Sequence, residues 1–255
     1  MGHWLRRATG RRRDAVSDRQ LARWLVVVAG AANAGGFMAV GRYTSHMTGI
    51  VSAMADDVAL AAGTAFLAGL GSLGAFLAGA GVSAILVNLA RRRGMQGEYA
   101  LPLALESLLL AGFAASGPLA AAAPGATAAA TVALLCFVMG LQNAVISKLS
   151  GARIRTTHVT GMATDLGIEL GKAAWRLAAL LGRPAPAATP SDPPPVRPDL
   201  EKLRTHGELI GLFFGSGLAG ALAFQRFGVA AALPLAAIAG AFAAGPLWED
   251  LRRRA

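Results

Sequence analysis

Six apolar stretches divide the chain, and each is long enough to cross a lipid bilayer as a helix. They run near 22–41, 64–89, 100–118, 126–147, 207–225 and 228–247. A helix needs about 20 apolar residues to span the hydrocarbon core of a bilayer. Only 15% of the residues are charged, whereas a soluble domain carries about 25%. The sequence therefore predicts an all-α integral membrane protein with six transmembrane helices, embedded in the lipid bilayer.

The positions of the basic residues predict the orientation of these helices. Of the 24 lysines and arginines, 22 lie in four segments, 1–23, 90–99, 148–206 and 248–255. Arg42 and Arg226 are the two exceptions. Because cytoplasmic loops carry an excess of basic residues, we expect both termini in the cytoplasm. The same distribution argues against nucleic-acid binding despite a net charge of +10, since the basic residues form no single soluble face.

Two linked motifs occur twice. Residues 44–49 read Thr-Ser-His-Met-Thr-Gly, and residues 156–161 read Thr-Thr-His-Val-Thr-Gly. Each copy follows a Gly-x-x-Asn-Ala segment, at 30–34 and at 140–144. Two motifs in the same order indicate an internal duplication. Each copy contains three of the six stretches, an odd number, so the copies must insert in opposite directions. This predicts two inverted-topology three-helix repeats, an arrangement common in secondary transporters.

The duplication sets the predicted domain boundaries. We expect a basic cytoplasmic tail at 1–21, the first repeat at 22–118, the second repeat at 126–247 and a second basic tail at 248–255. The second repeat contains an amphipathic helix at about 162–182, which we expect on the inner membrane surface. A linker at 183–198, with seven prolines, connects this helix to the fifth stretch.

Small residues recur at every fourth position along the last two stretches. They are Gly207, Gly211, Gly215, Ala219 and Ala223 in the fifth, and Ala232, Ala236, Gly240 and Ala244 in the sixth. Such stripes let helix backbones approach closely in lipid. They predict packing faces, either within one chain or between copies in a homo-oligomer.

The polar residues of the duplicated motifs are candidate substrate ligands. They are Asn33, Thr48 and Gly49 in the first copy, and Asn143, Thr160 and Gly161 in the second. Glycine and Asn-Ala weaken a membrane helix, and broken helices at matching places in inverted halves form the binding sites of many transporters. A second interpretation is that each threonine is the N-cap of the following helix. A cap would be duplicated as well, so the sequence leaves both interpretations open.

Three ionisable residues are candidates for proton or ion coupling. Glu106 interrupts an apolar stretch, where an ionised carboxylate is costly, so it should face the protein interior or water, or reach the headgroups. Ser107 and Arg42 are its candidate neighbours. His46 and His158 belong to the two motif copies and titrate near neutral pH. They are either proton relays or interfacial histidines hydrogen-bonded to nearby backbone.

Enzyme and metal chemistry receive no support from the sequence. The inverted topology puts the two motif histidines on opposite faces, and the single cysteine, Cys136, lies inside an apolar stretch. Neither a metal nor a cofactor is therefore predicted. The chain also lacks a nucleophile elbow, a His-Glu-x-x-His motif and a phosphate-binding Gly-Lys-Ser/Thr loop. We expect no enzymatic activity.

The combined motifs resemble a known family. The segments 29–34 (Ala-Gly-Ala-Ala-Asn-Ala), 47–50 (Met-Thr-Gly-Ile), 140–144 and 156–161 are similar to those of the YoaK-type bacterial membrane proteins, a domain-of-unknown-function family. The resemblance covers roughly residues 22 to 247 and implies a multi-pass protein of the bacterial inner membrane, without an assigned activity. This chain has Asn33 where the family usually has Asp, and Ile50 where it usually has Asn. If those family residues bind a ligand, this chain has lost one charge and one amide there.

The leading functional hypothesis is a small-molecule or ion transporter whose site lies between the two repeats. The alternative is a non-transporting membrane scaffold or partner subunit. A membrane enzyme is the third hypothesis. The sequence does not specify the substrate, the direction of transport or the coupling ion.

Overall fold

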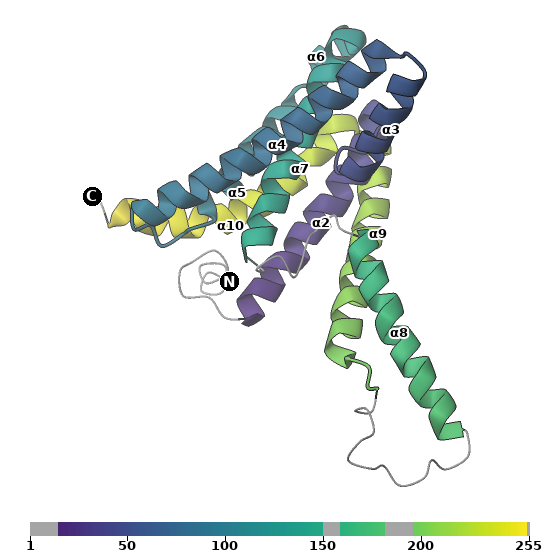
Figure 1. The fold of residues 1–255 in the computed structure, drawn as a ribbon. Coiled ribbons are helices and arrows are strands. Elements are labelled where there is room, and N and C mark those ends of the chain that lie inside the picture. Colours follow the sequence, from purple (N-terminus) through teal and green to yellow (C-terminus); the bar gives the residue numbers. More distant parts are fainter. Residues whose placement is uncertain (1–14, 150–158, 182–195, 254–255) are drawn as a thin grey trace. The chain divides into compact units, whose positions relative to one another are not determined.

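The computed structural model describes residues 15–149, 159–181 and 196–253, and every regular element in these ranges is helical (Figure 1). The α-helices are α2 (Ala15–Val40), α3 (Met47–Ala59), α4 (Gly63–Arg92), α5 (Ala100–Ala115), α6 (Gly117–Ala122), α7 (Pro124–Leu149), α8 (Val159–Leu181), α9 (Leu200–Phe227) and α10 (Leu233–Arg252). A short 3-10 helix, η1 (Gly228–Ala232), precedes α10. The predicted all-α class is confirmed.

Four of the six predicted apolar stretches lie in single helices, whereas 100–118 extends from α5 into α6 and 228–247 comprises η1 and most of α10. Four stretches are long and apolar enough to cross a membrane: Val16–Val40, Gly63–Arg92, Thr127–Leu149 and Leu200–Arg252. The last of these contains both α9 and α10, and α5 is a shorter apolar helix of 16 residues. The chain is therefore a multi-pass membrane protein. The predicted Pro-rich linker lies mostly outside the described residues.

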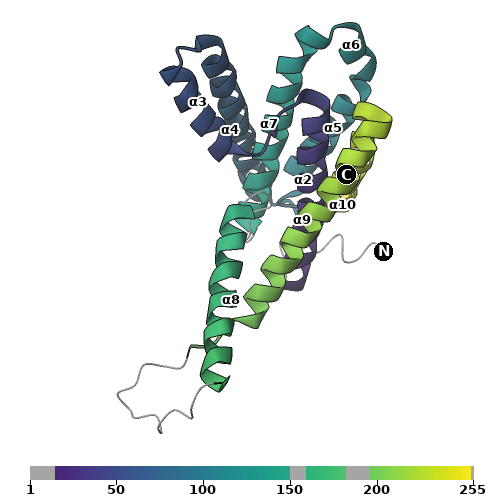
Figure 2. The ribbon, with the colours of Figure 1, turned by 90° about the vertical axis from the view of Figure 1, so that its right-hand side faces the viewer.

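The chain divides into two compact units. The first comprises residues 1–157 and 213–255, and the second comprises residues 158–212. In the first unit, α4 packs along α7 and α10 packs along α5 (Figure 2). The second unit contains α8 and the first part of α9, and α8 confirms the helix predicted at about 162–182.

Two groups of buried apolar side chains form the core of the first unit. One group joins α2, α4, α5, α7 and α10 through side chains that include Leu21, Val87, Leu103, Ile146 and Phe242. The other continues the core toward the opposite ends of these helices, with Val28, Phe113, Met139, Phe224 and Leu235. Both groups use residues from helices far apart in sequence, so the unit is held together by long-range apolar packing.

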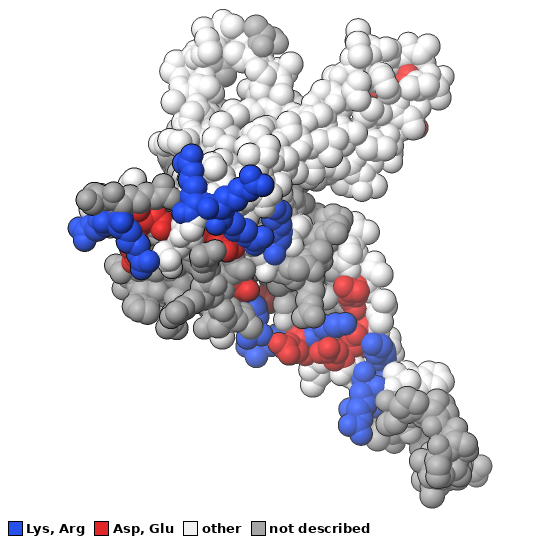
Figure 3. Space-filling model, turned by 60° about the vertical axis from the view of Figure 1, so that its left-hand side comes forward, with Lys and Arg blue, Asp and Glu red and all other residues white. Residues whose placement is uncertain are grey.

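One end of the first unit carries most of its described basic residues. Arg19 and Arg23 lie near the start of α2, and Arg91 and Arg92 end α4. Asp250, near the end of α10, accepts hydrogen bonds from the backbone N–H groups of Gln96 (2.7 Å) and Gly97 (3.2 Å), which follow α4. These helix ends are thereby fixed together. Figure 3 shows lysine and arginine side chains gathered below a region of the surface with almost no charge.

Glycines mark the points where helices cross. A Cβ added to Gly140 of α7 would overlap the backbone carbonyl of Phe76 in α4, and one added to Gly79 of α4 would overlap the carbonyl of Phe137. In the same way, a Cβ on Gly30 of α2 would lie 2.5 Å from the carbonyl oxygen of Phe213 in α9. In lipid, such close backbone contact is a main source of helix–helix attraction.

The stripe of small residues predicted for α9 makes no close helix contact within the described part of this chain, so its packing between copies stays a prediction. A Cβ on Gly207, Gly211 or Gly215 would meet no atom within 4 Å. The helix instead packs against α2 through Gly217 and Gly220, which are buried. Along η1 and α10 the predicted stripe packs in part, because Ala232 and Ala236 are buried and Gly240 faces Ser107 of α5, whereas Ala244 is exposed. A four-residue period of small residues identifies one face of a helix, but it does not identify which helix packs against that face.

Candidate functional site

The interruption between α2 and α3 lies after the Gly-x-x-Asn-Ala segment. We predicted that this segment breaks the helix, but α2 runs through Asn33 without a break and ends at Val40. Gly41 then adopts a positive φ of 69°, and the backbone stays non-helical up to His46. Helix α7 also runs unbroken through Asn143. The close packing of Gly30 and Gly140 on neighbouring helices stabilises the helical backbone that an exposed glycine would weaken.

Asn33 anchors the segment that follows α2. Its side-chain Oδ1 accepts hydrogen bonds from the backbone N–H of Ser45 (3.2 Å) and from the Ser45 hydroxyl (2.8 Å). The equivalent Asn143 donates its amide to the Met139 carbonyl within its own helix (2.8 Å). Its counterpart loop, residues 150–158, lies outside the described residues, as does His158. The Asn33 side chain therefore holds the 41–46 segment in place through Ser45.

The capping interpretation of the first motif is wrong. The N-cap of α3 is His46, and no side chain hydrogen-bonds to the free N–H groups of its first turn. Thr48 is exposed in that turn. In the second unit, α8 begins at Val159, so Thr160 and Gly161 are exposed residues of its first turn.

A cavity of about 360 Å³ opens beside the 41–46 segment. Its volume falls within the range of roughly 300–1,000 Å³ that small-molecule sites occupy. The end of α2, the 41–46 segment, α3 and α4 form its walls, and Val132 of α7 completes them. Of the six predicted substrate ligands, Gly49 lines this cavity. The polar lining comes from Arg42, Tyr43, His46, Asp57 and Ser72.

The charged side chains of the cavity have no protein partners among the described residues. Neither Arg42 nor Asp57 forms a side-chain hydrogen bond or an ion pair there. Gly49 makes room for the imidazole of His46, because a Cβ at residue 49 would overlap that ring. The ring of Tyr43 stacks on Phe37 with 4.6 Å between centroids, which gives the cavity an aromatic wall.

Arg42 and Asp57 were not predicted as site residues. Arg42 carried a signal, since it is one of two basic residues outside the four basic segments. Asp57 carried no such signal, because a carboxylate near the end of a short helix does not by itself indicate a cavity.

A buried polar pair lies between α5 and α7. Glu106 and Gln142 are both 0% exposed, and the Gln142 amide Nε2 donates a hydrogen bond to Glu106 Oε1 at 2.9 Å. Glu106 thus faces the protein interior, and the predicted reach to the headgroups is wrong. Its partner is Gln142 in place of the expected Arg42 or Ser107, since Ser107 donates to the Ala236 carbonyl (2.8 Å). Gln142 was missed, although a glutamine within an apolar stretch is itself a signal.

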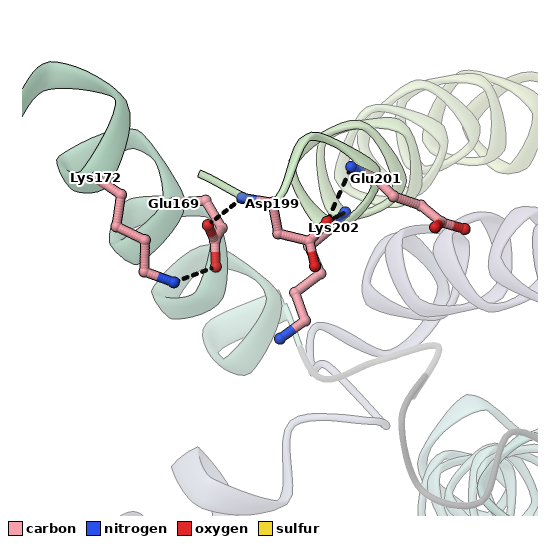
Figure 4. A network of polar contacts seen from close by, with 5 residues as sticks. All are labelled: Glu169, Lys172, Asp199, Glu201 and Lys202. Carbon is pink, nitrogen blue, oxygen red and sulfur yellow. Dashed lines mark hydrogen bonds and ion pairs between the residues drawn. The ribbon is translucent and has the colours of Figure 1, made fainter. Parts of the chain in front are cut away.

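The second unit holds a polar network at the start of α9 (Figure 4). Glu169 of α8 accepts hydrogen bonds from the backbone N–H of Asp199 (2.7 Å) and from the Lys172 ammonium (2.9 Å). Asp199 caps α9 by accepting the N–H groups of Glu201 and Lys202, each at 3.0 Å. The Asp199 N–H, followed by Lys172, lowers the pKa of Glu169. Glu169 is therefore a buried residue that joins α8 to the start of α9.

Metal binding has no candidate group in this part of the molecule. Among the described residues, no three His, Cys, Asp or Glu side chains lie close enough together to hold a metal ion.

Comparison with known proteins agrees with the motifs. No curated protein and no solved structure matches this chain. The family model described as "Protein of unknown function (DUF1275)" matches residues 21–245, which cover both motif copies and the helices that carry the cavity and the buried pair. This confirms the resemblance to the YoaK-type proteins. The chain belongs to the DUF1275 family of membrane proteins.

Proposed function

We propose that this protein transports a small zwitterionic solute across the bacterial inner membrane, and that the solute binds in the cavity beside residues 41–46. One observation carries the proposal. At the interruption between α2 and α3, the cavity presents a cation, Arg42, and an anion, Asp57, neither of which has a side-chain partner among the described residues. Non-helical backbone in a membrane protein occurs where it is buried in protein or lines a cavity.

Two inverted three-helix repeats, with both termini cytoplasmic, form the architecture of this proposed transporter. The glycines of the two motif copies support it. Gly30 of the first copy packs on the Phe213 carbonyl of α9, and Gly140 of the second packs on the Phe76 carbonyl of α4. Because α4 follows the first motif and α9 follows the second, each repeat gives the other the same contact. Such an exchange is expected from a two-fold pseudosymmetric protein.

The cavity lining supports a specific class of substrate. A carboxylate on the solute would pair with Arg42, and an ammonium group would pair with Asp57. Phe37, Tyr43 and the aliphatic lining would cover an apolar body. Arg42 and Asp57 do not pair with each other, so a solute with both charges can reach both residues without breaking an ion pair. Amino acids with apolar side chains have this chemistry.

Binding to the purified protein in nanodiscs tests the substrate class. The probes are leucine and phenylalanine, their methyl esters, which keep only the ammonium group, and their N-acetyl forms, which keep only the carboxylate. We expect the zwitterions to bind and both derivatives to bind at least tenfold more weakly. Hydrogen bonds to charged groups contribute about 1.5–3 kcal/mol, and a tenfold change corresponds to about 1.4 kcal/mol.

Matched variants identify the site. Arg42→Gln and Asp57→Asn should each weaken binding at least tenfold. The matched controls are Asp56→Asn, which removes the charge next to Asp57, and Arg226→Gln, which removes the other arginine outside the four basic segments. Neither residue lines the cavity, so each change should alter affinity less than twofold. Uptake of the bound solute into proteoliposomes then tests transport. Tight vesicles that show binding without flux would favour the scaffold or partner-subunit alternative.

A further inference from the structure

The Glu106–Gln142 pair has two oxygens without hydrogen-bond partners. Gln142 Nε2 donates to Glu106 Oε1 at 2.9 Å, which leaves Glu106 Oε2 and Gln142 Oε1. Both of these oxygens are buried, and neither has a partner among the described residues. Each belongs to a group whose other atom already takes part in the hydrogen bond. A carboxylate and a carboxamide joined in this way each have one acceptor left over.

The surroundings do not neutralise a carboxylate at residue 106. Glu106 forms no ion pair with a described residue, and its single side-chain hydrogen bond comes from a neutral amide. An ionised carboxylate that is fully buried among apolar helices, without a cation, is strongly disfavoured relative to its neutral form. Burial therefore favours the protonated acid.

The charged side chains of the helices that pack against α5 lie near the ends of those helices. Ionisable side chains on these elements are Arg91 and Arg92 of α4, Cys136 and Lys148 of α7, and Glu249, Asp250 and Arg252 of α10, with Tyr99 at the start of α5 itself. Helix α6 and η1 have none. Lys148 lies six residues beyond Gln142, which is about 9 Å along the helix axis. Asp250 is engaged with the backbone N–H groups of Gln96 and Gly97.

We propose that Glu106 and Gln142 form a proton-binding site, in which the Glu106 Oε2–H group donates a hydrogen bond to Gln142 Oε1. One proton then satisfies both leftover oxygens, and the two side chains close an eight-membered acid–amide ring with two parallel hydrogen bonds. Proton uptake converts the carboxylate to the acid, and release restores it. Gln142 recognises the acid form, because its oxygen can accept a hydrogen bond from the acid but not from a carboxylate.

The pair gives the proposed transporter its coupling ion, and this assignment rests on the proposed function. Proton binding by the pair, in contrast, is independent of transport. A sodium ion between the same two oxygens is the competing ligand, and it would need the ionised carboxylate. The two cases differ in the protonation state of residue 106, which spectroscopy measures directly.

Infrared spectroscopy of the full-length protein in nanodiscs, with ¹³C-carboxyl-labelled glutamate, tests the site without any variant. At neutral pH we expect one carbonyl band of a hydrogen-bonded protonated acid that is sensitive to the label. It should disappear in Glu106→Gln and remain in the matched control Glu201→Gln, an exposed carboxylate. In Gln142→Leu the band should shift to the frequency of an acid without a hydrogen bond. Absence of the protonated band in the wild type would overturn the proposal.

Stability and sodium dependence separate the two ligands. Glu106→Gln replaces the acid O–H by an amide N–H, so both hydrogen bonds persist and the unfolding midpoint should stay within 2 °C of the wild type. Glu106→Leu leaves the Gln142 amide unpaired and should lower the midpoint by several degrees. Stabilisation of the wild type by sodium over potassium, lost in Glu106→Gln, would show a cation site and overturn the proposal.

Transport measurements distinguish failure of the coupling role from failure of the proposed function. In proteoliposomes, Glu106→Gln should abolish accumulation driven by a pH gradient and should leave exchange of solute at equal pH. If accumulation persists in Glu106→Gln, the coupling role fails while the proposed transport stands. If the wild type shows no flux at all, the transport proposal fails, and the infrared result still decides proton binding.

Discussion

Gly140 of α7 lies directly against the backbone carbonyl of Phe76 in α4, and a Cβ at residue 140 would overlap that oxygen. Gly79 makes the corresponding contact from α4, on the Phe137 carbonyl of α7. Both helices therefore approach at backbone distance, without an intervening side chain. A carbonyl oxygen cannot move away as the end of a flexible side chain can, so the contact admits glycine alone.

Gly140→Ala should destabilise the protein by about 1–3 kcal/mol, because the added methyl group must push α4 and α7 apart. The matched control is Gly81→Ala in α4, where a Cβ would meet nothing within 4 Å. Alanine has the higher helix propensity by about 0.8–1.0 kcal/mol, so this change should be neutral or stabilising. Unfolding midpoints in detergent measure both. Equal unfolding midpoints for the two variants would contradict the close backbone contact between α4 and α7.

The sequence was sufficient to predict the long apolar helices, but neither the short helices α3 and α6 nor the neighbours of each helix. Length and apolar composition locate every stretch, since only lipid tolerates so much exposed apolar surface as Leu67, Leu77 and Ile85 of α4 present. The stripe Gly207–Gly211–Gly215 has the spacing of a packing face, yet no described residue of this chain packs closely on it. Which glycine is buried depends on the helix that reaches it, and that is a property of the tertiary fold.

The sequence predicted only part of the candidate site, because the contacts between helices are again a property of the tertiary fold. The motif directed attention to residues 44–49, and the cavity lies beside them. The partner of Glu106 could not be predicted, because Gln142 lies 36 residues away on another helix and a single glutamine has no periodicity. Asn33 was expected to bind substrate. Its hydrogen bond with Ser45 could not be predicted, because the two residues are 12 positions apart in the sequence.

Asn33→Asp should preserve the 41–46 segment, whereas Asn33→Leu should release it. The Asn33 side chain contributes one acceptor oxygen, which binds both the N–H and the hydroxyl of Ser45, and a carboxylate supplies the same acceptor. This accounts for the Asp that the family usually has here. Two hydrogen bonds of about 0.5–1.5 kcal/mol each predict a five- to 150-fold loss of amide-exchange protection in the leucine variant.

Hydrogen-exchange mass spectrometry of the 41–46 peptide provides this measurement. The control is Asn88→Leu, an exposed asparagine of α4 that should leave the peptide unchanged. Equal protection in the wild type and Asn33→Leu would show that the loop is held by other contacts.

Asp250→Ala should destabilise the first unit by about 1–3 kcal/mol. Asp250 is 6% exposed, and its carboxylate accepts the half-buried Gln96 and the buried Gly97 N–H groups, which alanine would leave without this acceptor. Arg253→Ala, at the exposed end of the same helix, is the control and should change stability by less than about 0.5 kcal/mol. Chemical unfolding in mixed micelles measures the stability of both variants. A loss of stability as small as that of Arg253→Ala would show that the hydrogen bonds of Asp250 do not hold these helix ends together.

Glu169 makes the attachment of α8 to the start of α9 dependent on pH. The Asp199 N–H, and after it Lys172, stabilise the charged form and lower the pKa of Glu169 in the folded protein. A carboxyl with a lowered folded pKa adds stability above its unfolded pKa, about 4.3, and loses it as the pH falls through the folded value. The attachment should therefore persist at neutral pH and weaken only as the pH falls below the ordinary range of a glutamate carboxyl.

The Asp199 amide resonance, in protein labelled with ¹⁵N-aspartate, reports this titration directly. Its chemical shift should change with a midpoint below 4.3, and the Lys172→Ala variant should move that midpoint upward because the second hydrogen bond to the carboxylate is lost. Asp165→Asn, an exposed residue of the same helix, should leave the midpoint unchanged. In Glu169→Gln the transition should vanish, since the amide keeps an acceptor for the Asp199 N–H but has no proton to lose in this range. An Asp199 resonance that titrates at the ordinary value in the wild type would mean that Glu169 is solvated and that the network of Figure 4 does not form in solution.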